Sequence, residues 1–212
     1  MAEDTDLGKT HVRFSICALC VAVTDATRHA TPFLHNQKLL ETDRFIVIPS
    51  LGPLMPGHVM VVGKEHLDSL ASMGRDALEE YEQLANHLRA APFLRDGKPL
   101  EAEHGSTAND KAGACVVHTH VHWLPGLGGY LDEFQKRLPL LSQREIIDVP
   151  ANVPYIFVRA GAEKALFHAA GLPSQTIRRT LCELLDRDDT DWMQAPRLDW
   201  VKETVQAWQS EM

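Results

Sequence analysis

The chain has 212 residues and a formal net charge of −8, from 21 Lys and Arg against 29 Asp and Glu. Hydrophobic residues make up 44% and charged residues 24%, which is typical of a globular protein and excludes disordered, collagen-like and coiled-coil chains. An acidic chain lacks the broad basic face that general nucleic-acid binding requires. We therefore expect a folded protein of one or two domains without a nucleic-acid partner.

No apolar run reaches the roughly 20 residues that a membrane-spanning helix needs, and the acidic start of the chain differs from a secretory signal. Four cysteines are too few for a disulfide scaffold. We therefore expect a cytoplasmic protein with no membrane partner. Six of the 11 histidines stand at positions 58, 66, 104, 118, 120 and 122, and this clustering is the first indication of chemistry.

The hydrophobic pattern predicts strands and helices interspersed along the chain. Apolar or alternating runs bounded by Gly and Pro predict five strands, at residues 44–50, 57–63, 100–106, 115–124 and 154–159. Apolar residues at helical spacing predict four helices, over residues 69–89 and 131–138, after Pro173-Ser174, and from Leu198 to Trp208.

His118, His120 and His122 are two residues apart, so on a strand their side chains would share one face. Three imidazoles on one face are costly without hydrogen-bond partners or a metal. They could be exposed on a solvated face, bind zinc, or include a catalytic nucleophile. The neighbouring Val121 and Trp123 indicate a buried strand and argue against the solvated face.

The residues around this row resemble the histidine triad (HIT) family of nucleotidyl hydrolases and transferases. Four ordered segments carry the resemblance, which covers roughly residues 14–125. His118 to Pro125 resembles the family signature, and Gly57 to His66 resembles the family's G-H-x-L-V-I-P-K-x-H segment. Ala112-Gly113 stands where the family has a small-residue loop, and Cys17-x-x-Cys20 is similar to a zinc-binding subset.

The resemblance implies an α+β, HIT-like fold in which an antiparallel sheet carries helices on one side, followed by a C-terminal helical extension. Pro150 and Pro154 mark a boundary. We therefore expect a HIT-like catalytic domain over residues 14–149 and a C-terminal extension over residues 150–212 that packs on it. The resemblance further implies a homodimer.

Carried over by position, the catalytic residues are His120, His122 and His118. His120 would be the nucleophile that forms a nucleotidyl-imidazole intermediate, with its other ring nitrogen held by an acceptor. His122 would donate to phosphate oxygens or to the leaving group. The substrate is expected to be a nucleoside polyphosphate, such as a diadenosine polyphosphate, or a nucleoside phosphoramidate.

The expected substrate-binding residues are Gly105, Ser106, His104 and Ser50. The first three lie where family members place small or amide-bearing residues near phosphate, although a plain turn is an equally good interpretation. Ser50 stands where many members have a ribose-binding Asp, and Ala114-Cys115 stands where many have Gln-Ser. These departures concern the identity of the substrate and leave the nucleophile unchanged.

The zinc-binding subset implies a metal site formed by Cys17, Cys20, His66 and His118. Two thiolates and two imidazoles form a closed tetrahedral set, which is typical of structural zinc. The alternative for the cysteine pair is a redox motif.

The leading hypothesis is a nucleotide-cleaving enzyme that works through His120. The same site could instead serve a nucleotidyl transferase or phosphorylase, or the chain could be a zinc-stabilised nucleotide-binding adaptor with little turnover. We interpret His58 as an ordinary strand residue rather than one that approaches the nucleotide, and Arg178-Arg179 as a solvated helix face rather than a phosphate-facing pair. We interpret Trp192 as a packing residue of the C-terminal helices rather than part of a base-stacking platform.

Overall fold

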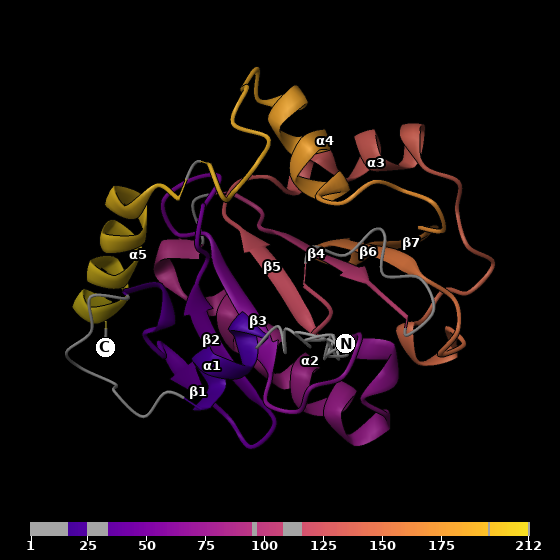
Figure 1. Ribbon diagram of the computed structural model, residues 1–212, viewed down its shortest axis with the longest axis horizontal. Helices are drawn as coiled ribbons and strands as arrows, with labels where there is room; N and C mark the ends of the chain where they lie inside the picture. The colour runs from indigo at the N-terminus through magenta and orange to yellow at the C-terminus, as the bar shows by residue number, and fades with distance from the viewer. Residues whose placement is uncertain (1–16, 25–33, 95–96, 108–115, 195, 212) are drawn as a thin grey trace, which may run out of the picture.

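A computed structural model describes residues 17–24, 34–94, 97–107, 116–194 and 196–211. Its centre is a seven-stranded antiparallel sheet with the strand order β1-β2-β3-β5-β4-β6-β7 (Figure 1). The strands are β1 (Leu40–Glu41), β2 (Phe45–Pro49), β3 (Val59–Gly63), β4 (Leu100–Gly105), β5 (His120–Leu124), β6 (Tyr155–Ala160) and β7 (Glu163–His168). The helices of the described part are α1 (Ala18–Thr24), α2 (Arg75–Ala90), α3 (Leu131–Arg137), α4 (Thr176–Leu184) and α5 (Leu198–Glu211). The α+β class and the antiparallel sheet are confirmed.

One face of the sheet packs against α2 and α5. The cluster joins buried apolar side chains of β2, β3 and β5 to the apolar sides of both helices. Its members include Phe45, Val47, Trp123, Tyr81 and Val205. Because side chains alternate along a strand, Trp123 on this face leaves its neighbours His122 and Leu124 to the opposite face.

The opposite face is also covered, so the expectation of helices on one side is wrong. Leu19 and Ala22 of α1 pack on apolar residues of β2 and β3. Apolar residues of α3 and α4 pack together on β4, β5 and β6, and Figure 1 shows these two helices away from α5, which contacts β2. The physical reason is that the central strands are buried on both faces, as the unbroken burial of Phe45–Pro49 shows.

The C-terminal part of the chain continues the sheet. β6 pairs with β4, with Glu103 opposite Phe157, and β7 completes a hairpin with β6. Residues 150–212 therefore add two strands to the sheet before α4 and α5. The boundary at residues 149 and 150 stays a prediction, although hydrogen-bonded strands from both sides of it belong to one sheet.

Element ends differ from the sequence expectations in informative places. β5 begins at His120 rather than at residue 115, and His118 lies in a bend before it. β1, β7 and α1 were not expected, since each is short or carries no clear periodicity. No helix within the described ranges combines the length and apolar character needed to cross a bilayer.

Two buried carboxyl groups of β4 face the α2 side of the sheet. Glu101 accepts hydrogen bonds from Arg159 Nε at 2.7 Å and from Tyr81 Oη at 3.1 Å. Glu103 accepts from Leu70 N at 2.8 Å and from the Tyr155 hydroxyl. Glu101 is thus paired with a cation, whereas the bonds that Glu103 accepts come from uncharged groups.

This difference predicts a pH-dependent stability that depends on Glu103. Burial raises its pKa to about 7 from 4.5, so the folded state binds the proton more tightly than the unfolded state. The proton bound to Glu103 therefore stabilises the folded state. This contribution is fully present below the unfolded-state pKa of 4.5 and is lost as the pH rises through the folded-state pKa of about 7. Between pH 5 and pH 8 we expect the unfolding free energy of the native protein to fall by about 2 to 3 kcal/mol relative to that of Glu103→Gln.

Urea denaturation of both proteins at the two pH values measures this difference. Glu79→Gln, at an exposed position of α2, serves as the control and should follow the native profile. Parallel pH profiles for the native protein and Glu103→Gln would contradict the prediction.

Candidate functional site

A cavity of about 470 Å³ lies over the face of the sheet that carries His120 and His122. α1 and the residues that follow β2 line one part of it, and α4 lines another. Most lining residues are apolar, and the polar ones include several histidines and Arg178. Among the described lining residues none is Asp or Glu. The cavity is therefore lined mainly by apolar side chains, with several imidazole side chains among the polar ones.

His120 has a defined tautomer. Its Nδ1 lies 2.7 Å from the backbone oxygen of His118, and because a carbonyl oxygen only accepts, Nδ1 must carry the proton. The other nitrogen, Nε2, then carries a lone pair. Burial lowers the pKa of the ring, and the hydrogen bond to the His118 carbonyl opposes this effect. A neutral imidazole oriented in this way is a competent nucleophile.

His122 is oriented by a second chain of hydrogen bonds. The Leu54 backbone N–H donates to His58 Nδ1 at 3.1 Å, so His58 carries its proton on Nε2. His58 Nε2 lies 3.0 Å from His122 Nδ1 and donates to it. His122 therefore carries its own proton on Nε2. Burial lowers the pKa of His58 to about 3 and that of His122 well below its usual value, with the charge of Arg178 contributing to both.

His120 and His122 thus present opposite functions to the cavity. Their rings lie edge to face with centroids 5.1 Å apart. His120 offers a lone pair at its Nε2, and His122 offers an N–H donor at its Nε2. Such a pair can attack an electrophilic centre and stabilise the negative charge that develops on it.

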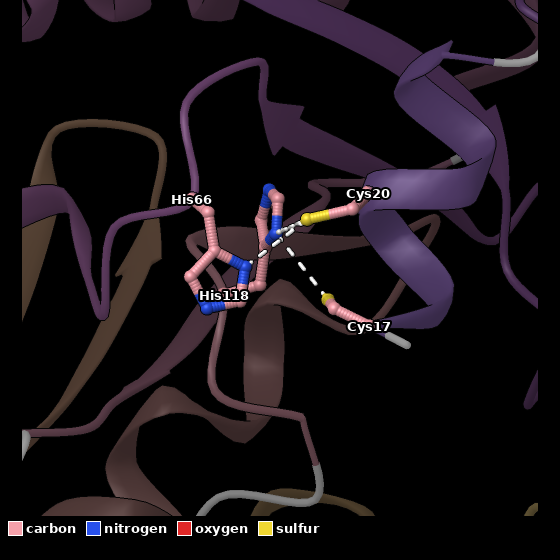
Figure 2. A group of neighbouring side chains, drawn as sticks. All are labelled: Cys17, Cys20, His66 and His118. Carbon is pink, nitrogen blue, oxygen red and sulfur yellow. Dashed lines mark hydrogen bonds between the residues drawn. The ribbon is translucent and has the colours of Figure 1, made fainter. Parts of the chain in front are cut away.

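Cys17, Cys20, His66 and His118 form a compact cluster at the start of α1 (Figure 2). Their ligand atoms all lie within 4.8 Å of one another. Cys20 Sγ is 3.1 Å from His66 Nδ1, and the Sγ atoms of both cysteines are 3.5 Å from His118 Nδ1. A tetrahedral zinc ion with ordinary bond lengths holds S and N ligands about 3.5 Å apart. The donor set and its spacing fit zinc.

His118 is oriented toward this cluster by its other nitrogen. His118 Nε2 lies 2.7 Å from the Gly63 backbone oxygen and donates to it, which leaves the lone pair on Nδ1 toward the cysteines. The ring of His118 therefore belongs to the cluster, whereas its carbonyl orients His120. The row of three histidines divides into one cluster residue and two cavity residues.

The predicted substrate-binding residues separate in a similar way. Ser50 and His104 line the cavity. Gly105 packs against Tyr155, whose ring would lie 2.4 Å from an added Cβ, and Ser106 donates to the Thr107 carbonyl at 3.4 Å. Neither is among the residues that line the cavity. Ala112-Gly113 and Ala114-Cys115 lie outside the described residues.

Sequence reasoning missed three residues of the site. His58 is not an ordinary strand residue, because it lines the cavity and orients His122. Arg178 is buried and lines the cavity, and only its neighbour Arg179 is exposed. Trp192 also lines the cavity. The position of His58 beside Gly57 was an available signal, whereas α4 and Trp192 reach the site only through tertiary packing.

A family model described as "HIT domain" matches residues 33–128. Similar solved structures include a histidine triad protein from Clostridium difficile, 25% identical, which covers 52% of this chain and 90% of its own with a TM-score of 0.38. A zinc-bound histidine triad family protein from Mycobacterium smegmatis is 21% identical and covers 52% of this chain and 74% of its own, with a TM-score of 0.39. A HIT family hydrolase from Clostridium thermocellum is 20% identical. The match covers 53% of this chain and 91% of the hydrolase, with a TM-score of 0.38. No curated protein matches the chain.

Proposed function

We propose that this protein, in which residues 33–128 match a family model described as "HIT domain", is a nucleotide-cleaving enzyme that attacks the α-phosphate of its substrate through His120. The observation that carries the proposal is the pair of oriented imidazoles. A backbone carbonyl leaves a lone pair on His120 Nε2, and the relay from Leu54 through His58 leaves a proton on His122 Nε2.

In the first step, His120 Nε2 attacks the α-phosphorus. The N–P bond forms as the bond from phosphorus to the bridging atom breaks, and the electron pair leaves on that atom. The ring becomes a nucleotidyl-imidazolium, which keeps its Nδ1 proton on the His118 carbonyl. His122 Nε2–H donates a hydrogen bond to a phosphate oxygen and stabilises the developing charge.

In the second step, water attacks the phosphorus. The P–N bond breaks and its electron pair returns to His120 Nε2. The products are a nucleoside monophosphate and one proton released to solvent, and the neutral imidazole is restored. Inorganic phosphate or a sugar phosphate in place of water would make the same site a phosphorylase or a nucleotidyl transferase.

The cavity supports a nucleoside as the bound group. Its volume of about 470 Å³ lies within the usual range of small-molecule sites. Leu19, Ile48 and Met60 line it with apolar surface suitable for a base, and Ser50 adds a hydroxyl for a sugar. The absence of Asp and Glu among the described lining residues favours an anionic substrate.

We also propose that the cluster of Cys17, Cys20, His66 and His118 binds a structural zinc ion. Two thiolates and two imidazoles complete a tetrahedral set and leave no position for substrate. When bound, the ion supplies a crosslink between α1 and the sheet. The dimer and the cytoplasmic location expected from the sequence stay predictions.

Mass spectrometry tests the enzymatic proposal. The protein is incubated with a panel of nucleotides, and the reaction is quenched without acid. We expect a mass increase of one nucleotidyl group that maps to His120. The nucleotide product identifies hydrolysis, phosphorolysis or transfer when water, phosphate or a sugar phosphate is supplied. Binding of nucleotides without any adduct or turnover would favour the adaptor function.

A further inference from the structure

The C-terminal part of the chain places a cation on the wall of the cavity. α4 and the residues on either side of it contribute Gln175, Ile177, Arg178, Leu181 and Trp192 to the lining. Arg178 is nine-tenths buried, with 9% of its surface exposed. Within the described lining it is the one Lys or Arg, and no carboxylate accompanies it.

Backbone carbonyls hold the guanidinium of Arg178 in place. Its Nη1 donates to the Gly52 oxygen, and its Nε and Nη2 donate to the Asp189 backbone oxygen at 2.9 and 2.7 Å. Its Nη2 is also 3.4 Å from Asp189 Oδ2. A guanidinium has five N–H groups, so these bonds leave one N–H of Nη1 for a ligand, counting partners in the described residues. These hydrogen bonds fix the position and orientation of the Arg178 guanidinium.

The charge of Arg178 is only weakly neutralised. The carboxylate of Asp189 pairs more closely with Arg187, whose Nε lies 2.8 Å from Asp189 Oδ1 and whose Nη2 contacts Oδ2. Asp191 contributes a further negative charge from a partly exposed position, where solvent screens it. The other titratable neighbours are Cys182 of α4 and the two histidines described next.

The segment after β2 links Arg178 to the His122 side of the nucleophile. Arg178 donates to the Gly52 oxygen, and two residues further on the Leu54 N–H donates to His58, which orients His122. The charge of Arg178 lowers the pKa values of His58 and His122, whereas the neighbouring charge that acts on His120 is that of His118. His122 accepts a hydrogen bond at Nδ1 and is therefore neutral. Giving up its Nε2 proton would create an imidazolate, so His122 can stabilise an anionic leaving group but is a poor acid for an amine.

We propose that Arg178 binds a phosphate group on the leaving side of the scissile bond, and thereby favours nucleoside polyphosphates over nucleoside phosphoramidates. This inference rests on the proposed function and assigns its substrate class. A polyphosphate departs as an anion that needs no proton, and an arginine fork is suited to phosphate oxygens. An amine leaving group takes a proton that neither Arg178 nor His122 supplies.

Steady-state kinetics with Arg178→Gln tests this assignment, with Arg179→Gln as the matched control at the exposed neighbouring position. For a dinucleoside polyphosphate we expect kcat/KM to fall on the order of 10- to 100-fold in Arg178→Gln. For a nucleoside phosphoramidate we expect a change of less than about 3-fold, and the control should match the native protein with both substrates. Equal losses with the two substrates, or no loss with the polyphosphate, would overturn the inference.

Binding of inorganic tripolyphosphate, measured by titration calorimetry, separates this inference from the proposed function. It requires no turnover, so a protein that forms no His120 adduct can still be tested. We expect Arg178→Gln to bind at least about 10-fold more weakly than the native protein, and Arg178→Lys, which keeps the charge without the fork, to lie between them. If both variants fold and bind tripolyphosphate with native affinity, Arg178 does not bind phosphate. If Arg178→Gln does not fold, the affinity of Arg178→Lys by itself decides the question.

Discussion

Replacement of His120 by Asn is expected to lower turnover at least about 10⁴-fold, because it removes the imidazole lone pair that the His118 carbonyl orients beside His122. Asn preserves a polar group of similar width but cannot form the nucleotidyl-imidazolium. Quenched samples of the variant should contain no nucleotidyl adduct. Nucleotide affinity should change little, since the apolar lining of the cavity and Arg178 remain.

His168→Asn provides the matched control, because His168 is exposed on β7 and is not among the residues that line the cavity. It should retain native turnover and the adduct. His122→Asn should form the adduct slowly, because it lacks the imidazole N–H that stabilises charge on the phosphate. An adduct in His120→Asn, or native turnover by that variant, would remove His120 from the nucleophilic role.

The second large effect is expected from the Cys/His cluster. Purified native protein should contain one zinc ion per chain, and Cys20→Ala should contain none. A metal present at 1,000 times its dissociation constant stabilises the folded state by about 4 kcal/mol. Loss of the ion should therefore lower the melting temperature by on the order of 10 °C in a chain of this size.

Metal analysis by mass spectrometry and thermal unfolding with and without a chelator measure both quantities. Cys182→Ala is the matched control, because Cys182 is a buried residue of α4 and lies outside the cluster. It should keep its zinc, and its melting temperature should still respond to the chelator. Native protein that purifies without zinc and does not bind added zinc would disprove the metal proposal.

The two sites are connected through His118. Its ring is held between the cysteines and the Gly63 carbonyl, and its own carbonyl orients His120. A displaced ring would shift the backbone that sets the tautomer of the nucleophile. For this reason, we expect chelation to reduce activity at temperatures where the protein is still folded.

The order of most strands and helices, but not β1, β7 and α1, could be predicted from the sequence, because hydrophobic periodicity and Gly or Pro boundaries are local properties. The histidine row and the Cys17-x-x-Cys20 pair were equally readable, because their spacing alone brings ligands or catalytic groups together. The predicted metal set is found as one cluster. Element ends were less certain, since β5 starts only where pairing with β3 begins, at His120.

The sequence by itself determined the type of chemistry, in the alternation of imidazoles along one extended segment. Tertiary structure decided how the groups are used. The Leu54 amide and His58 determine the tautomer of His122, and α4 brings Arg178 to the Gly52 carbonyl from 126 positions away in the chain. No local pattern encodes these contacts, because they depend on how distant segments pack on the same face of the sheet.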